Sequence, residues 1–156
     1  MLNLKKRELP MIELRFDLPG HLAGGEPCFI AFQARAGGSV NPAHVEAMDA
    51  LRERGRVADR MRAEIKDIAQ QERARSVDIE AMGAGRFMAM YDACVIGWQT
   101  NILSAGSPLT CDRQTFADLL AIKGEPELRD AIIALEAKVI EAGEALRKVQ
   151  DAAIKN

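Results

Sequence analysis

Aromatic residues and histidines are scarce in this sequence. Only 4% of the 156 residues are aromatic, with Trp98 as the single tryptophan and Tyr91 as the single tyrosine, and the only histidines are His21 and His44. Neither histidine has a second ligand nearby at the spacing of a metal site. We therefore expect no bound metal, and we expect the one indole to anchor an irregular connection to the core.

The cysteines are too few and too far apart to build a framework. Cys28, Cys94 and Cys111 are odd in number and include no C-x-x-C pair, which argues against both a disulfide scaffold and a zinc knuckle. A reducing, cytoplasmic setting fits this usage best. A chain of 156 residues can bury a sizeable core without such links, and we expect a single domain over 1–156.

The charges are balanced and no long apolar run is present. Lys and Arg total 21 against 23 Asp and Glu, a net charge of −2, which is untypical of a dedicated nucleic-acid or anionic-membrane protein. The longest segment without charged residues, Ala93–Cys111, contains Gln99, Asn101 and Pro108, which do not suit a membrane span. Lys5-Lys6-Arg7 is followed by Pro10 rather than by the apolar region of a signal peptide.

No arrangement of residues predicts catalysis or a cofactor. A nucleophile needs a base that a third group orients, and no spacing pairs a cysteine or serine with a histidine in this way. Gly83-Ala84-Gly85 lacks the third glycine and the preceding strand of a nucleotide-binding loop, so close helix packing is the better interpretation. We expect no enzyme activity and no cofactor.

An N-terminal β-hairpin is predicted over residues 10–36. Ile12, Leu14, Phe16 and Leu18 alternate with charged residues, which is typical of a strand with one solvent-exposed face. Pro19-Gly20 ends this strand, and Cys28–Phe32 is a second apolar run that pairs back on it. Two strands alone are marginal in water, so the hairpin must pack on helices or on another copy of the chain.

Long helices are predicted over residues 41–98. Asn41-Pro42 is a typical helix start. The apolar positions that follow at spacings of three or four are Val45, Met48, Leu51, Val57, Met61, Ile65 and Ile68. Their phase shifts near Gly55, which predicts a kink or break. A second helix is predicted to start near Ser76 or Asp78 and to run toward Trp98.

Two C-terminal helices are predicted over residues 112–155. Asp112 is a natural N-cap for the first, Lys123-Gly124 ends it, and Glu125-Pro126 starts the second. The second helix carries an apolar stripe of Leu128, Ile132, Leu135, Val139, Ala142 and Leu146. That stripe serves either as a surface for self-association or as part of the core. Together these patterns predict a mainly α fold with a small N-terminal β-hairpin, an α+β arrangement.

Six residues are the candidates for partner contact or structural anchoring: Met82, Phe87, Met90, Trp98, Leu119 and Leu120. Methionine suits both irregular cores and adaptable binding grooves, so Met82 and Met90 fit either role. A separate candidate is the arginine-rich face from Arg52 to Arg75, which could contact nucleic acid. Because Glu53, Asp59, Glu64, Asp67 and Glu72 interleave with it, a solvated, salt-bridged face is favoured.

The region from Tyr91 to Ile132 resembles the tail assembly chaperones of long-tailed bacteriophages and prophages. The resemblance rests on the helix end Tyr91–Trp98 with its Val-x-Gly-Trp pattern, on Gly106 and Pro108, and on the capped helix with the pair Leu119-Leu120. The chain departs from the pattern at Gln99–Leu103, which lacks acidic residues.

This resemblance implies a non-enzymatic role in tail assembly. The protein would bind the tape measure protein, promote its hand-over to the tail tube protein, form a homo-oligomer, work in the host cytoplasm and be absent from the mature virion. Members of that family often make a longer product by ribosomal frameshifting, and Met1 and Met11 are both candidate starts. A structural virion component, such as a head–tail connector or minor tail protein, is the alternative. A helical nucleic-acid-binding regulator is a third hypothesis.

Overall fold

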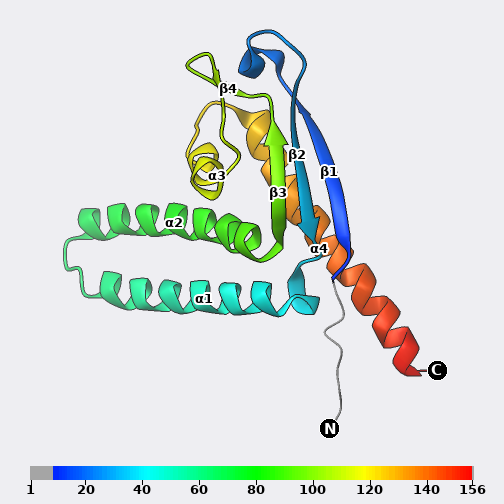
Figure 1. Ribbon diagram of the computed structural model, residues 1–156. Coiled ribbons are helices and arrows are strands. Elements are labelled where there is room, and N and C mark those ends of the chain that lie inside the picture. Colours follow the sequence, from blue (N-terminus) through cyan, green and yellow to red (C-terminus); the bar gives the residue numbers. More distant parts are fainter. Residues whose placement is uncertain (1–8, 156) are drawn as a thin grey trace.

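The computed structural model describes residues 9–155 and confirms a mainly α fold with a small N-terminal antiparallel sheet (Figure 1). The elements, in chain order, are β1 Met11–Leu18, η1 Gly20–Ala23, β2 Cys28–Arg35, η2 Gly38–Val40, α1 Pro42–Ala63, α2 Ile68–Cys94, β3 Val95–Thr100, β4 Leu103–Ser104, β5 Ser107–Pro108, α3 Arg113–Leu120 and α4 Pro126–Lys155. Lys5-Lys6-Arg7 and Met1 lie outside the described residues.

The predicted hairpin is formed by β1 and β2. They pair antiparallel in continuous register from Met11 opposite Arg35 to Leu18 opposite Cys28. The alternating side chains of β1 place its apolar residues on the inner face and its charged residues on the outer face, as the sequence pattern predicts.

A third strand, β3, completes the sheet in the order β1-β2-β3. The prediction of helix through Trp98 is therefore wrong in its last part, because α2 ends at Cys94 and the chain turns directly into an extended strand. Gln33 pairs with Gly97 and Ala34 with Val95, so Ile96 is the extra residue of a β-bulge. β-Branched Val95 and Ile96 favour this extended conformation.

The helices α1 and α2 form an antiparallel hairpin that projects away from the sheet (Figure 1). The predicted break at Gly55 is wrong, because α1 continues through it to Ala63. The predicted start of the second helix at Ser76 or Asp78 is also wrong. α2 begins at Ile68, where the Asp67 carboxylate accepts a hydrogen bond from the Gln70 N–H at 2.9 Å and caps the helix.

The two C-terminal helices begin where their caps predict. The Asp112 carboxylate accepts a hydrogen bond from the Thr115 N–H at 2.8 Å at the start of α3, which lowers the pKa of Asp112. Gly124, with φ of 87°, turns the chain into α4. In Figure 1 α4 crosses behind the sheet, and its residues Leu128, Ile132, Leu135 and Val139 are buried in the core.

The core lies between the inner face of the sheet and the helices α2, α3 and α4. An aromatic cluster occupies its centre: the Phe32 ring centroid lies 6.1 Å from the rings of both Trp98 and Phe116. We call the sheet, α3, α4 and the end of α2 from Phe87 onward the body of the molecule. The inner-face residues of the sheet are Ile12, Leu14, Phe16, Leu18, Cys28, Ile30, Phe32, Ala34 and Trp98.

A close backbone approach joins the loop after β2 to α4. The Gly37 N–H donates to the Val139 carbonyl at 2.8 Å. A Cβ at Gly143 would lie 1.8 Å from the Gly37 carbonyl oxygen, so only glycine fits there without moving backbone. This contact fixes the start of α1 relative to the body. None of the helices within residues 9–155 combines the length and apolarity that crossing a membrane requires.

Candidate protein-binding surface on the α1–α2 arm

Four of the six residues singled out in the sequence lie inside the body. Phe87, Met90, Trp98 and Leu119 are buried in the core cluster. They come from α2, β3 and α3 and pack together, so in this chain they serve as structural anchors.

Leu120 and Met82 are only half-buried. Leu120 lines a shallow surface hollow of about 360 Å³ near the start of α4. Met82 lies in the contact between α1 and α2, where its Cε would be 3.2 Å from a Cβ at Gly55. Because they are partly exposed, these two residues remain candidates for contact with a partner.

Trp98 anchors the connection between α2 and the C-terminal helices, as expected for the single indole. Its ring stacks on Phe32 and meets Phe116 edge-on at 6.2 Å. The indole Nε1 is buried and has no hydrogen-bond partner among residues 9–155. Its contribution to the body is therefore that of a large apolar surface.

A buried cluster of Asn41, His44 and Cys94 brings together residue types that can act as a catalytic group. The Cys94 Sγ lies 3.8 Å from His44 Nδ1 and 3.7 Å from Asn41 Nδ2. Sequence spacing missed this cluster, because α1 and the end of α2 meet only in the folded chain. No short-range pattern in the sequence signals it.

The surroundings of this cluster are those of a packing element. His44 Nδ1 accepts a hydrogen bond from the Gly38 N–H at 2.8 Å, and Asn41 donates to the carbonyls of Ala36 and Ala93. Burial raises the pKa of the Cys94 thiol to about 11, so the thiol stays protonated near neutral pH. The cluster ties the start of α1 to the end of α2.

Within the part of the chain that the structure describes, no group of three or more His, Cys, Asp or Glu residues could hold a metal ion.

The arm, defined as residues 42–85, is held together by small residues. A Cβ at Gly85 would lie 2.6 Å from Leu51 Cδ1, and Gly55 faces Met82 in the same contact. We call this contact the arm seam. Leu51 is the one large apolar residue of the arm that is fully buried. The seam therefore stabilises the arm through close backbone approach more than through buried apolar area.

Next to the seam, both helices carry a second row of residues, which we call the arm stripe. In α1 it consists of Ala43, Ala47, Ala50, Arg54, Val57 and Met61, and in α2 of Gln70, Ala74, Val77, Ala81 and Ala84. The alternating spacing of four and three residues places each row on one side of its helix. Apart from Arg54 and Gln70 the members are apolar, yet Val57, Met61 and Val77 are exposed by 43%, 67% and 66%.

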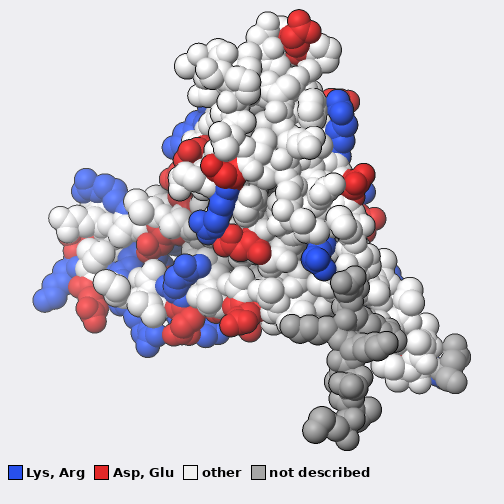
Figure 2. All heavy atoms as spheres, viewed as in Figure 1, with Lys and Arg blue, Asp and Glu red and all other residues white. Residues whose placement is uncertain are grey.

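The two rows of the arm stripe lie on the same side of the arm. A shallow groove of about 260 Å³ between the helices is lined by Arg54 of one row and Ala81 of the other, together with Leu51, Ala58, Met82 and Gly85 of the seam and with Asp78. Charged side chains of both signs gather over the arm, with uncharged patches between them (Figure 2). A helix with two adjacent apolar rows is typical of a bundle of more than two helices.

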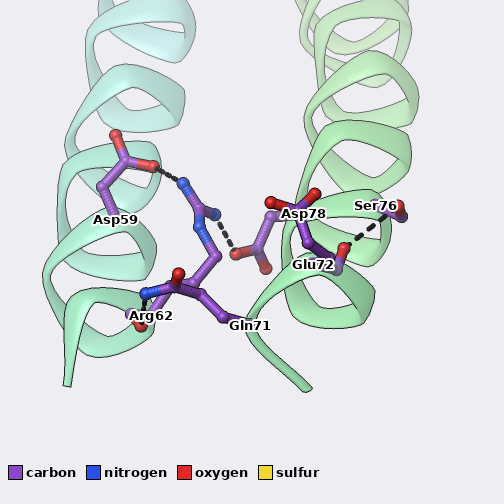
Figure 3. Close-up of polar contacts among 6 residues, drawn as sticks. All are labelled: Asp59, Arg62, Gln71, Glu72, Ser76 and Asp78. Carbon is purple, nitrogen blue, oxygen red and sulfur yellow. Dashed lines mark hydrogen bonds and ion pairs between the residues drawn. The ribbon is translucent and has the colours of Figure 1, made fainter. Parts of the chain in front are cut away.

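Toward the tip of the arm, the contact between α1 and α2 is polar. The Arg62 guanidinium lies between the carboxylates of Asp59 and Asp78, at 2.5 Å from each, and so joins α1 to α2 (Figure 3). These carboxylates raise the pKa of Arg62. Other ion pairs on α1 are Arg52 with Asp49, and Arg56 and Arg60 with Glu53.

These ion pairs bear on the arginine-rich face considered in the sequence. Four of its arginines, Arg52, Arg56, Arg60 and Arg62, are paired with carboxylates on the arm itself. Paired arginines offer less unbalanced positive charge to a phosphate backbone, which favours the interpretation as a solvated, salt-bridged face.

The sequence pattern places Val57 and Met61 among the apolar positions of the predicted helix but does not identify the arm stripe. The missed signal is the second row of alanines, valines and methionines beside the seam. Alanines at Ala43, Ala47 and Ala50 contribute little to an amphipathic pattern, so the row is easily overlooked.

Comparisons with protein-family models, with curated proteins and with solved structures give no match to this chain.

Proposed function

We propose that this protein is a non-enzymatic assembly chaperone that holds an apolar, helical segment of a client protein against its arm. The observation that carries the proposal is the arm stripe, an apolar surface whose large residues Val57, Met61 and Val77 are exposed. Two adjacent helices with apolar rows form a groove into which the apolar face of a third helix packs.

The particular role we propose is that of a tail assembly chaperone of a long-tailed bacteriophage or prophage. The resemblance of residues 91–132 to that family supports it. The client would be the tape measure protein, which is handed to the tail tube protein during assembly in the host cytoplasm. Ala84 of the arm stripe lies two turns before this segment on the same helix.

A co-purification experiment with the tape measure protein tests the client. The tape measure protein encoded beside the gene should remain soluble when co-expressed with this chain and should co-purify with it. Val77→Glu should abolish co-purification, because it places a charge in the arm stripe. Val149→Glu is the matched control, since Val149 is a valine on α4 with an exposure of 67% against 66% for Val77. Equal binding by both variants would remove the arm as the client site.

The content of the finished particle separates a chaperone from a virion component. Mass spectrometry of purified particles should find the tape measure and tail tube proteins without this chain. A stoichiometric amount of this chain in the particle would contradict the chaperone role and favour a head–tail connector or minor tail protein. A gene neighbourhood without tail genes would contradict both.

A further inference from the structure

We infer that the free edge of β1 is a binding site for an extended segment of a partner protein, which adds to the sheet as a fourth strand. In this segment, apolar residues alternate with basic ones. β1 lies at one end of the strand order β1-β2-β3 and forms the right-hand edge of the sheet in Figure 1. The site belongs to the body, so the inference goes beyond the proposed function of the arm and does not depend on it.

The backbone of β1 offers a row of hydrogen-bonding groups that β2 does not use. The Ala36 N–H donates to the Pro10 carbonyl at 3.2 Å, and hydrogen-bonded pairs in an antiparallel ladder recur at every second residue. The apolar inner-face residues of β1 therefore direct their backbone groups to β2. The residues that direct them to the free edge are Met11, Glu13, Arg15 and Asp17. Among residues 9–155, none of these edge groups has a hydrogen-bond partner.

β1 also lacks the features that normally protect the edge of a sheet. Edge strands are commonly kept short, interrupted by a bulge or a proline, or given a charged side chain on the inner face. β3, at the other edge, has 6 residues and contains the bulge at Ile96. β1 has 8 residues, contains no proline, pairs without interruption and has apolar side chains on its inner face. β1 is therefore the edge to which another strand can be added.

The inner face of the sheet is covered less completely under β1 than under β2. Ile30, Phe32 and Ala34 of β2 are exposed by 2% or less. The residues of β1 that pair with them are only partly buried, namely Phe16, Leu14 and Ile12. A strand added about 4.8 Å beyond β1 would place every second side chain beside these three. Apolar residues at those positions of the partner would bury the apolar surface that β1 leaves exposed.

The outer face of β1 favours basic residues in the partner. The Arg15 guanidinium lies 4.2 Å from the centroid of the Phe29 ring on β2, so its charge is turned away from the free edge. Glu13 and Asp17 form no ion pair with any residue in the described range. Opposite charges at directly facing positions stabilise strand pairing. Basic residues supply them, whereas a second copy of the chain would bring the same two carboxylates.

A labelled peptide with the expected pattern tests the site. In acetyl-Thr-Val-Lys-Val-Thr-Val-Lys-Val-Thr-amide, laid antiparallel to β1, the lysines face Asp17 and Glu13 and the central threonine faces Arg15. Fluorescence anisotropy should show saturable binding to the full chain. Replacing both lysines of the peptide by glutamate should weaken binding about tenfold. No saturable binding below about 1 mM would overturn the inference.

A charge exchange on the protein tests the position of the peptide. The double variant Glu13→Lys with Asp17→Lys should reverse the preference, binding the glutamate peptide more tightly than the lysine peptide. Glu46→Lys with Glu64→Lys is the matched control, because it changes the net charge equally at two exposed acidic residues of the arm. The control should keep the preference for lysine. The same response in both double variants would mean that only net charge attracts the peptide, and would overturn the inference.

A proline on the free edge tests the backbone pairing. Arg15→Pro removes an N–H that points away from β2, so the ladder between β1 and β2 stays complete while the free edge loses a donor. Binding of the lysine peptide should weaken by about tenfold or more. Arg15→Ala is the control, because it keeps the N–H and should bind within about twofold of the wild type. Equal binding by the two variants would contradict strand addition.

N-methylated peptides give the same test on the wild-type chain, without any risk to folding. A methyl group on the central threonine N–H, which faces β1, should abolish binding. A methyl group on the N–H of a neighbouring valine, which faces away from β1, should leave binding unchanged. Equal effects of the two methyl groups would show that the peptide does not pair as a strand.

Amide hydrogen exchange identifies what occupies the edge. In the dilute free chain the amides of Glu13, Arg15 and Asp17 should exchange quickly, whereas those of Leu14 and Phe16 should exchange slowly because they are bonded to β2. The lysine peptide should protect the first group. Protection already present in the dilute free chain would assign the edge to the chain's own terminus. Protection that appears only on concentrating the chain would assign it to a second copy, and either result would overturn the inference.

The outcomes separate this site from the proposed function. Val77→Glu, which should abolish binding of the tape measure protein, should bind the lysine peptide as the wild type does. Arg15→Pro should do the reverse. A chain that binds the tape measure protein but not the peptide would end the inference and leave the proposed function in place. A chain that binds the peptide at β1 but not the tape measure protein would end the proposed function and leave the inference in place.

Discussion

The body packs large side chains around one core, whereas the arm places small residues in its seam and large ones on its surface. In the body, Phe32, Phe116 and Leu135 are almost completely inaccessible. In the arm, Leu51 is buried, but Val57 and Met61 face outward. The body can therefore be stable by itself, while the arm gains most of its apolar burial only when another helix or another chain covers it.

Removing the indole from the body should have the largest effect. Trp98→Ala should lower the free energy of unfolding by about 4 kcal/mol, because it leaves a cavity beside Phe32 and Phe116. Urea unfolding followed by circular dichroism measures this. Trp98→Phe is the control and should cost less than half as much, since the Nε1 atom that it removes has no hydrogen-bond partner among the described residues. An unchanged midpoint for Trp98→Ala would place the indole outside the core.

The same substitution in the two regions tests the comparison directly. Leu135→Ala in the body should cost about 3 to 4 kcal/mol, whereas Leu51→Ala in the arm should cost about 2 kcal/mol or less. Leu51 is buried to almost the same degree, but its neighbours across the seam are Gly85 and the flexible Met82. Equal losses in urea unfolding would mean that the arm has a core comparable to that of the body.

Replacing a helix glycine by alanine should change the stability of the protein in opposite directions at two positions. Gly143→Ala should destabilise the protein by about 2 kcal/mol, because its Cβ would overlap the Gly37 carbonyl oxygen and force the backbone apart. Gly83→Ala, where a Cβ meets nothing within 4 Å, should stabilise the arm by about 0.5 to 1 kcal/mol through helix propensity. Thermal unfolding of the two variants measures both stability changes. Changes of the same sign in the two variants would contradict the packing described for Gly143.

The smallest predicted effect concerns the junction between the two regions. Burial lowers the pKa of His44, and the nearby Glu136 carboxylate offsets this only in part. In the unfolded chain His44 binds a proton with the ordinary pKa of about 6.5, whereas in the native chain it binds the proton only at a lower pH. The contribution of neutral His44 to the free energy of unfolding should therefore be fully present above pH 6.5. It should decline as the pH falls through that value toward the lowered native pKa.

Urea midpoints between pH 5.5 and 7.5 check this expectation. His44→Gln should remove the dependence, since glutamine keeps polar atoms at the position but does not titrate in this range. His21, which is exposed and pairs with Glu125, stays present in both proteins and serves as the internal reference. An unchanged slope in His44→Gln would assign the effect to other groups.

The sequence predicts the local elements of the fold that depend on near neighbours. The alternation from Ile12 to Leu18 and the caps Asn41 and Asp112 are properties of a few adjacent residues, and the structure has the strand and both helix starts. β3 was missed because a strand that follows a helix without a turn owes its conformation to pairing with β2, far away in the chain. The start of α2 was missed because Asp67 lies in a highly charged stretch where one acidic cap does not stand out.

The candidate site was harder to predict than the fold. An apolar row identifies a helix face but does not state whether this chain covers it. The phase shift near Gly55 separates Val57 from Leu51 but does not tell which of the two is buried. Only the position of α2, with its glycine seam, decides that Leu51 is buried and that Val57 is exposed. The meeting of His44 with Cys94 likewise depends on how the arm joins the body.

The position of Trp98 has a practical consequence for spectroscopy. Because the only tryptophan lies in the body, and the only tyrosine, Tyr91, stacks at 4.6 Å on Phe116 beside it, all strong intrinsic fluorescence comes from one half of the molecule. Melting or docking of the helical hairpin should leave that emission almost unchanged. A dye attached near Asp67 at the tip, read against the native indole, would report the two halves separately.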